Sequence, residues 1–379
     1  MKIGILTFHF AHNNGAMLQA YGLSHYLREK GYNAEIIDYR LRHIYQWKEK
    51  YTVYSYYKAQ REDGFSVIKS LLRTLRYYRN LQYNHDESWN SFEYFMKKYL
   101  HKSRRIYSSQ LKSLKYDILI CGSDQIWNTE LTGGFEPTYL LSFTKKARKI
   151  SYAASSGSNK LDVTNIDYIT EYLRQFKAIS CRESGLADFI SNILDKNVTV
   201  VCDPVFLLDK NEWDKIAQES KLSVNKPYVL VYSYWEDEYF YEQLSSFVKR
   251  SGLSIVKIGI QHKEYLPPKD FPHIQYVDAG PIEFLHLIRN ANYVFTNMFH
   301  GTAVSLIFNK NFSIILPPVR QERLREILDR TKLWSRVISE GSDSIPDTDK
   351  IDYDKVNKII TEFKTQSINF LSNAINNLG

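Results

Sequence analysis

The residues best suited to chemistry in this sequence stand immediately after apolar stretches. In NANYVFTNMFHGTAVSLIFNKNF, residues 290–312, an apolar run ends, His300 and Gly301 follow, and a helical pattern begins at Thr302. We therefore expect a helix that starts at Thr302 and whose free N–H groups attract a phosphate or carboxylate. An imidazole there could bind such an anion or deliver a proton, because it titrates near neutral pH. A histidine that caps a helix or fills a wet cleft fits the same pattern.

Two further charged residues follow apolar runs in the same way. Arg182 comes after KAISC and offers a planar guanidinium to a carboxylate or phosphate. Asp124, in CGSDQIWN, is a candidate base or a partner for a sugar hydroxyl. By spacing alone, a surface salt bridge for Arg182 and a turn or N-cap role for Asp124 are the commoner interpretations.

A wider set of candidates follows from one rule. Open α/β sheets bind ligands at the carboxyl ends of their strands, so the residues after each strand are candidates, among them Glu183 and Asp203. Two arginines of PPVRQERLREIL could also reach such a cleft, although a charged helix face is their commoner explanation. The predicted substrate-binding residues are Asn14, Gly15, Gly122, Ser123, Ser156, Gly301, Thr302, Arg320 and Arg323.

The sequence offers no convincing set of metal ligands. His9 and His12 are close, but no carboxylate or cysteine completes a suitable spacing. Cys121, Cys181 and Cys202 each end an apolar run without a C-x-x-C pair, so we expect buried free thiols and a reducing compartment. There is no G-x-S-x-G elbow or Walker loop. We therefore expect no metal.

Alternating strand and helix patterns must position these residues. KIGILTF, AMLQAYGLSHYLREKG and AEIIDY predict a strand, a helix and a strand, which is a βαβ opening of a parallel sheet. Four more strands are expected at YDILICG, RKISYAA, FKAISCR and VTVVCDP. After an expected linker at LDKNEWDKIAQESKLSVNKP, a second alternating series runs from YVLVYSYW to FSIILPP, and one long helix closes the chain. The pattern predicts two doubly wound, Rossmann-like α/β domains.

The predicted domains have the following limits. We expect an N-terminal α/β domain over residues 1–208, a C-terminal α/β domain with the F-H-G motif over 209–345, and a closing helix over 346–379. Residues 41–110 are helical in pattern, basic and rich in Tyr, and we interpret them as a helical insertion in the first domain. Such a segment suits a membrane interface or, equally, a packed helical cap with solvated basic faces.

Composition sets the broad class of protein. The 379 residues are 44% hydrophobic and 24% charged, which is ordinary for a globular chain of two or three domains. The net charge of +8 favours an anionic partner such as a phosphorylated metabolite, a lipid headgroup or nucleic acid. No run approaches the roughly 18 apolar residues of a membrane span, and no secretory signal is evident, so we expect a cytoplasmic protein.

An ordered set of segments resembles a known family. NNGAMLQAYGL, LICGSDQIWN, SYAASSG, ISCRESG, CDPVFLL and FTNMFHGTAVSLIFNKNF are similar, in this order, to the polysaccharide pyruvyl transferase family from about residue 3 to about residue 330. The resemblance implies a fold like that of two-domain GT-B glycosyltransferases. It also implies transfer of the enolpyruvyl carbons of phosphoenolpyruvate onto two hydroxyls of a sugar, which leaves a pyruvate ketal and phosphate. The chain has Met298 where the family often has Ser before F-H-G.

The resemblance assigns roles to the candidates. It makes His300 the essential histidine and Arg182 the arginine that binds phosphoenolpyruvate. We expect His300 to be the general acid or to neutralise the departing phosphate, and Asp124 to orient or deprotonate a sugar hydroxyl. Phosphoenolpyruvate is then a co-substrate, and no cofactor is implied. Acceptors in such pathways are commonly lipid-linked sugars at the inner face of the membrane, so peripheral membrane contact through residues 41–110 is a further hypothesis.

Two other functions fit parts of the sequence. A nucleotide-sugar glycosyltransferase of the same architecture would bind its donor in the C-terminal domain, where Glu283 is a candidate to hold the ribose. A nucleic-acid-binding protein fits the interleaved aromatic and basic residues of 41–110, but no known module is present and the charge excess is modest. We expect no nucleic-acid partner. The acceptor sugar and the oligomeric state cannot be predicted from this sequence.

Overall fold

A computed structural model describes residues 1–41, 66–72, 75, 86–259, 267–268, 271–319, 321–338 and 350–376. Within them, a first parallel sheet of five strands has the order β2-β1-β3-β4-β5. Its strands are β1 (Lys2–Leu6), β2 (Asn33–Ile36), β3 (Ile118–Cys121), β4 (Arg148–Ser151) and β5 (Phe176–Ala178).

A second parallel sheet of five strands has the order β10-β9-β8-β11-β12. Its strands are β8 (Tyr228–Tyr232), β9 (Ser254–Ile258), β10 (Ile274–Val277), β11 (Tyr293–Thr296) and β12 (Phe312–Ile314). Between the two sheets along the chain, β6 (Ser180–Cys181) and β7 (Thr199–Val200) form a short parallel pair. The two large sheets have the flavodoxin-like and the Rossmann strand orders respectively. The prediction of two doubly wound α/β units is confirmed.

Helices follow most strands, as parallel connections require. The α-helices are α1 (Asn14–Glu29), α5 (Asp86–Tyr99), α6 (Thr129–Thr132), α7 (Ile166–Leu173), α8 (Ser184–Leu194), α9 (Lys210–Ala217), α10 (Glu238–Ser251), α11 (Pro281–Asn290), α12 (Phe299–Ile307), α13 (Glu322–Thr331) and α14 (Tyr353–Asn376). Short 3-10 turns are η1 (Ser108–Ser113), η2 (Pro137–Leu140), η3 (Val163–Asn165), η4 (Pro204–Phe206) and η5 (Trp334–Arg336).

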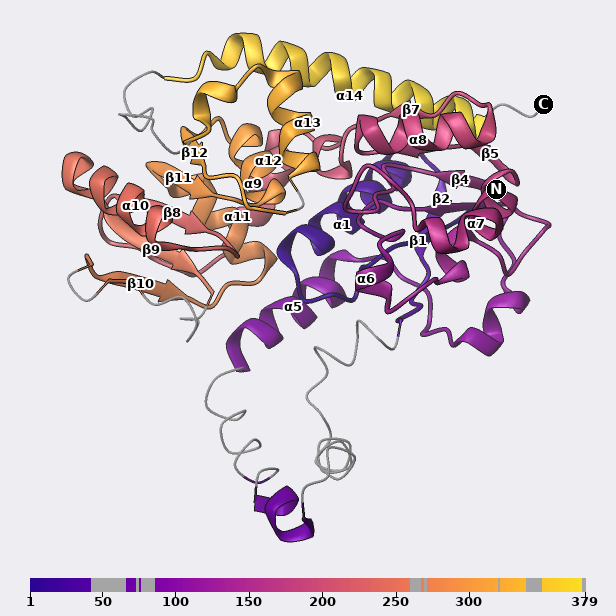
Figure 1. The fold of residues 1–379 in the computed structure, drawn as a ribbon, viewed down its shortest axis with the longest axis horizontal. Helices are drawn as coiled ribbons and strands as arrows, with labels where there is room; N and C mark the ends of the chain where they lie inside the picture. Colours follow the sequence, from indigo (N-terminus) through magenta and orange to yellow (C-terminus); the bar gives the residue numbers. More distant parts are fainter. Residues whose placement is uncertain are drawn as a thin grey trace.

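The two halves lie side by side, and α14 runs along both of them (Figure 1). Near its start the Tyr353 hydroxyl bonds the carbonyl of Lys310, which precedes β12 of the second half. At its other end the carbonyl of Ile375 accepts a 2.6 Å hydrogen bond from Arg148 in β4 of the first half. The predicted closing helix therefore joins the C-terminal half back to the N-terminal one. None of the described helices combines the length and apolar character that crossing a bilayer requires.

Three predicted elements differ from the structure. The expected linker at residues 208–227 contains α9, whose Trp213 is buried, so this segment belongs to the core. The expected strand at FKAISCR breaks after β5, and its last residues pair with β7 instead. The helix expected from Thr302 begins three residues earlier, at Phe299. The first segment was taken for a linker because α9 is mostly polar in sequence. The second was taken for one strand because an apolar run does not show which strand it pairs with.

Only part of the predicted helical insertion can be compared with the structure. Helix α5 is described and packs against α1 and α11, while most of residues 42–85 lie outside the described part of the chain. The predicted limits of the three domains stay a proposal.

One apolar cluster contains residues of both halves, and Trp213 is among its most buried large side chains. Its side chain is 1% exposed, its ring centroid lies 5.6 Å from that of Tyr21 in α1, and its indole N–H donates to the Val205 carbonyl at 3.0 Å. We expect Trp213→Ala to destabilise the protein by about 3–5 kcal/mol, because it leaves a large cavity. Denaturant unfolding followed by circular dichroism measures this change. Trp213→Phe keeps most of the apolar volume and should cost clearly less; equal losses would contradict the packing argument.

Candidate active site

The candidate site lies where the switch points of the two sheets face each other. In each sheet the strand order reverses next to the first strand, between β1 and β3 and between β8 and β11. Ligands of open α/β sheets bind at such switch points, outside the carboxyl ends of the strands. The segments that leave these strands carry Gly15, Ser123 and His300, so the topology brings predicted site residues of both halves together.

His300 lies in the first turn of α12 and packs against the first turn of α1. A Cβ atom added to Gly15 would lie only 1.9 Å from Nδ1 of His300, so the imidazole occupies the space that any side chain at residue 15 would need. His300 is 7% exposed. The N-terminal ends of two helices, one from each half, therefore meet at this ring, and helix N-termini favour negative charge.

Asp203 connects His300 to Arg182. One carboxylate oxygen, Oδ2, lies 3.1 Å from Nη2 of Arg182 and 3.5 Å from Nε2 of His300. The other oxygen accepts the backbone N–H of Val205 at 3.0 Å, which fixes the carboxylate at the start of η4. Burial opposes ionisation of Asp203, but Arg182 and His300 outweigh it and hold its pKa at about 2. The sequence placed Asp203 after a strand but gave no reason to choose it.

Arg182 is a buried charge with several contacts in the site. It is 3% exposed, its Nη2 donates to Oγ of Ser123 at 2.5 Å, and its guanidinium carbon lies 5.3 Å from the centre of the Phe299 ring. Its Nε and Nη1 have no hydrogen-bond partner among the described residues, although both atoms are buried. Buried donors are normally satisfied, so two unused donors on one guanidinium fit the binding of a carboxylate or phosphate.

Glu183 and Arg323 extend the charged cluster. Glu183 is 1% exposed and its Oε1 accepts from Oγ of Ser155 at 2.7 Å, while its Oε2 lacks a hydrogen-bond partner within the described ranges. Burial raises the pKa of Glu183 to about 6, and Arg182 opposes that shift. The pKa of Arg323 is lowered by burial and then by the positive charge of Arg182. Two arginines that disfavour each other's charge gain from a bound anion.

Asp124 and its neighbours form a tight turn after β3. Asp124 has φ of +79°, and its carboxylate accepts the N–H of Gln125 at 2.8 Å, so one oxygen is used locally. Gly122 has φ of +109°, and a Cβ there would lie 2.2 Å from the Tyr152 carbonyl oxygen. Glycine is therefore required at residue 122 for backbone reasons. The predicted role of Asp124 toward a sugar hydroxyl stays a prediction.

Of the remaining predicted binding residues, some form local hydrogen bonds or packing contacts, and one is not among the residues that the structure describes. The Thr302 hydroxyl and N–H both bond the carbonyl of Met298, and Ser156 donates to the carbonyl of Ser158. Gly301 lets α12 pack on β11, because a Cβ would lie 2.4 Å from Oγ1 of Thr296. Oδ1 of Asn14 is buried without a partner among the described residues. Arg320 lies outside the described residues.

Helix α5 supports the loop that leads into α1. The ring of His12 stacks on Phe92 with centroids 5.1 Å apart, and it lies 4.0 Å from the ring of Trp89. Nε2 of His12 is 3.1 Å from Oε1 of Glu93, a hydrogen bond that lowers the pKa of Glu93. The sequence alone did not indicate a partner for His12, because Glu93 lies about 80 residues further along the chain.

The expectation for the cysteines is confirmed: Cys121, Cys181 and Cys202 are free and buried. His9 pairs with Asp38 at 3.1 Å in a buried contact, and Asp38 also binds Arg40 and Lys102. These groups therefore form a cluster that stabilises the structure of the first half.

The fold defines the class of protein. Two Rossmann-like halves that face each other, with a C-terminal helix that returns to the first half, make this a GT-B-like protein. Staphylococcus aureus MnaA, solved with UDP, aligns with a TM-score of 0.52 and 11% identity over 99% of this chain and 97% of that one. A structure from Listeria monocytogenes, assigned as a UDP-N-acetylglucosamine 2-epimerase, aligns with a TM-score of 0.52 and 9% identity over 99% and 96% of the chains. At these identities the likeness shows the fold alone.

The family follows from the sequence. The family model for polysaccharide pyruvyl transferase matches residues 13–316, which include His300, Arg182, Asp124 and Asp203. The chain belongs to the polysaccharide pyruvyl transferase family, as the resemblance predicted. No curated protein matches the sequence.

The contact between residue 15 and the imidazole predicts an effect on catalysis. We expect Gly15→Ala to leave the fold intact, since alanine suits a helix, but to displace His300 and lower the catalytic rate by about a hundredfold. A double-mutant cycle with His300→Ala, read by steady-state kinetics and thermal melting, checks this. In the His300→Ala background the alanine at residue 15 should have little further effect; full additivity would contradict the contact.

The buried carboxyl of Glu183 predicts a pH dependence of stability. Because its folded-state pKa is about 6 against an ordinary 4.5, the folded state binds more protons, and stability falls as pH rises between these values. The loss amounts to about 2 kcal/mol. Glu183→Gln should therefore raise the free energy of unfolding at pH 7 by about that amount and flatten this window. Asp203 acts in a lower window, where stability is lost as pH falls from 3.8 towards about 2.

Denaturant unfolding at several pH values measures the effect of Glu183→Gln. Glu242→Gln, at an exposed residue of α10, is the matched control and should change nothing. A Glu183→Gln protein that is less stable than the wild type at pH 7 would show that the carboxylate is stabilised by its arginines in the folded state.

Proposed function

We propose that this chain transfers a pyruvyl group from phosphoenolpyruvate to two hydroxyls of a sugar in a cell-surface polysaccharide or its lipid-linked precursor. The observation that carries the proposal is the buried guanidinium of Arg182, which pairs with Asp203 through Nη2 and whose Nε and Nη1 have no hydrogen-bond partner among the described residues. Phosphoenolpyruvate carries a carboxylate and a phosphate, and guanidinium N–H donors bind both groups well. Arg323 adds a second positive charge next to Arg182.

The reaction balances through the two hydroxyls of the acceptor. A proton adds to the terminal carbon of the enol, one hydroxyl oxygen bonds to the central carbon, and the second hydroxyl oxygen replaces the phosphate there. Of the two hydroxyl protons, one accounts for the new methyl hydrogen and the other leaves with phosphate. The protein must supply a proton donor and must stabilise positive charge at the central carbon and negative charge on the phosphate.

His300 is the proposed proton donor, or the group that neutralises the departing phosphate. Asp203, at 3.5 Å from its Nε2, orients the ring. Asp203 is thus a positioning residue for both His300 and Arg182. The N-terminal turns of α1 and α12 add positive potential on the same side.

The nucleotide-sugar glycosyltransferase alternative has less support. Glu283, its candidate ribose ligand, accepts the N–H of Gly280 at 3.2 Å and thereby caps its own helix. We further propose that the protein works in the cytoplasm at the inner face of the membrane, with residues 41–110 as the membrane-contacting segment. The charge and the aromatic residues of that segment support this proposal.

Three substitutions test the function. We expect Arg182→Ala and His300→Ala to lower kcat/KM by about 10²–10⁴-fold, because each removes charge stabilisation or proton transfer from the transition state. Asp203→Asn should lower kcat and shift the pH–rate profile, since the ring loses its carboxylate partner. The assay measures phosphate release from phosphoenolpyruvate in the presence of an extract of lipid-linked sugars. Mass spectrometry of the acceptor then checks that its mass has increased by one pyruvic acid minus one water.

A control on the same helix as Arg323 separates site effects from loss of surface charge. Arg325→Ala removes an arginine that bonds Gln321 on the exposed side of α13, and it should retain wild-type turnover. The proposal is wrong if His300→Ala or Arg182→Ala turns over phosphoenolpyruvate at the wild-type rate, or if the wild-type product gains a hexose.

A further inference from the structure

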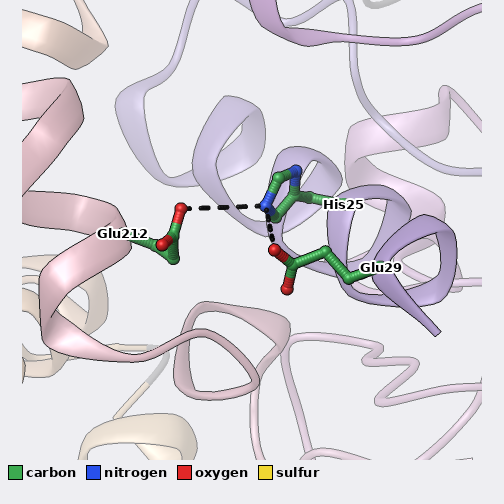
Figure 2. Close-up of side chains that lie close together, drawn as sticks. All are labelled: His25, Glu29 and Glu212. Carbon is green, nitrogen blue, oxygen red and sulfur yellow. Dashed lines mark ion pairs between the residues drawn. The ribbon is translucent and has the colours of Figure 1, made fainter.

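A second cluster of chemically active side chains lies at the other end of α1. His25 and Glu29 stand one turn apart on α1, and Glu212 reaches them from α9 (Figure 2). Nε2 of His25 lies 3.2 Å from Oε1 of Glu29 and 3.9 Å from Oε2 of Glu212. Within the described residues, this is the group of His, Cys, Asp and Glu whose ligand atoms all lie within 4.8 Å of one another.

These separations suit ligands of one small cation. With metal–ligand bonds of about 2.0–2.1 Å, two donors of a tetrahedral zinc site stand about 3.3 Å apart. The distance between His25 and Glu29 already matches this value, and Glu212 is 27% exposed, which leaves its side chain room to approach. Figure 2 shows one oxygen of Glu29 and one of Glu212 directed at the same imidazole nitrogen of His25.

Neighbouring residues hold the three candidate ligand side chains in place, and the two carboxylates favour a positive charge between them. The Tyr21 ring stacks on the imidazole with centroids 4.8 Å apart, which limits rotation of the ring. Lys215 binds Oε1 of Glu212 at 2.5 Å and leaves Oε2 for the cluster. Nε2 of His25 is buried and has no hydrogen-bond donor or acceptor at bonding geometry within the described ranges. Two carboxylates that converge on one imidazole repel each other, and a cation between them relieves this repulsion.

We propose that His25, Glu29 and Glu212 bind one divalent transition-metal ion, of which zinc is the best fit. One imidazole and two carboxylates are borderline ligands that suit Zn²⁺ and neighbouring ions, and three protein ligands leave a position for water. The sequence shows the His25–Glu29 pair, but Glu212 is remote in the chain and only the fold supplies it.

The location gives this site a structural role. Helix α1 belongs to the first half, whereas α9 packs on α11 of the second half, where Arg289 binds Asp214 at 2.5 Å. The metal therefore ties the two halves together through α1, whose first turn carries Gly15 at the active site. His25 is ten residues further along the helix, or about 15 Å away, so the ion takes no part in the chemistry.

Metal titration of the purified full-length chain tests the proposal. After treatment with EDTA and its removal, we expect calorimetry with Zn²⁺ to show a binding event that His25→Ala abolishes. Glu212→Gln and Glu29→Gln should each lower the affinity for Zn²⁺ at least about tenfold. Even the loss of a residue that only hydrogen-bonds to a metal ligand lowers metal affinity by about that factor. Co²⁺ in place of Zn²⁺ should give visible absorption bands that the same variants lose.

Glu242→Gln is the matched control at an exposed glutamate outside the cluster, and it should bind Zn²⁺ like the wild type. Thermal melting separates a metal site from a simple ion-pair cluster: a metal site raises the melting temperature of the wild type with Zn²⁺ and not that of Glu212→Gln. Melting of each variant in EDTA shows that it folds. The proposal is overturned if the wild type binds no Zn²⁺, or if His25→Ala binds it with wild-type affinity.

Discussion

The buried carboxylate of Asp203 is the constraint on which the centre of this molecule depends. A charge at 2% exposure is tolerated only with partners, and its partners are Arg182 from its own half and His300 from the other. The first half supplies the guanidinium of Arg182 and the N–H of Val205, and the second half adds the imidazole. The contact between Asp203 and His300 joins the two halves, and it also orients a candidate catalytic group.

The backbone of both halves also converges on this site. Each sheet reverses its strand order beside its first strand, and the segments that leave the switch points supply α1 and the turn at Gly122 on one side and α12 on the other. The fold thus aims two helix N-termini at one place, and Gly15 gives the imidazole the space between them. The charges come from the segments that follow the short β6–β7 pair: Arg182 comes directly after β6, and Asp203 lies three residues after β7.

Much of this was predictable from the sequence. The strands of both sheets, the closing helix, and His300 and Arg182 as candidates follow from local patterns, because buried parallel strands are short apolar runs and functional residues follow them. The start of α12 was misplaced because an aromatic residue and a histidine before a glycine carry no capping signal. The segment with Trp213 was taken for a linker because its eight-residue helix is mostly polar, and only the packing partners of the tryptophan make it core.

The sequence by itself determined which side chains are present and which of them stand at the ends of strands. It could not determine which of these side chains interact electrostatically, because that depends on their distance in space. Asp203 lies 97 residues before His300, and Glu212 lies 187 residues after His25. Only the tertiary structure decided that Arg182, Asp203 and His300 form one cluster and that His25, Glu29 and Glu212 form another. Electrostatic interaction falls off within a few ångströms of separation in water and is set by burial, and neither quantity is written in the local sequence.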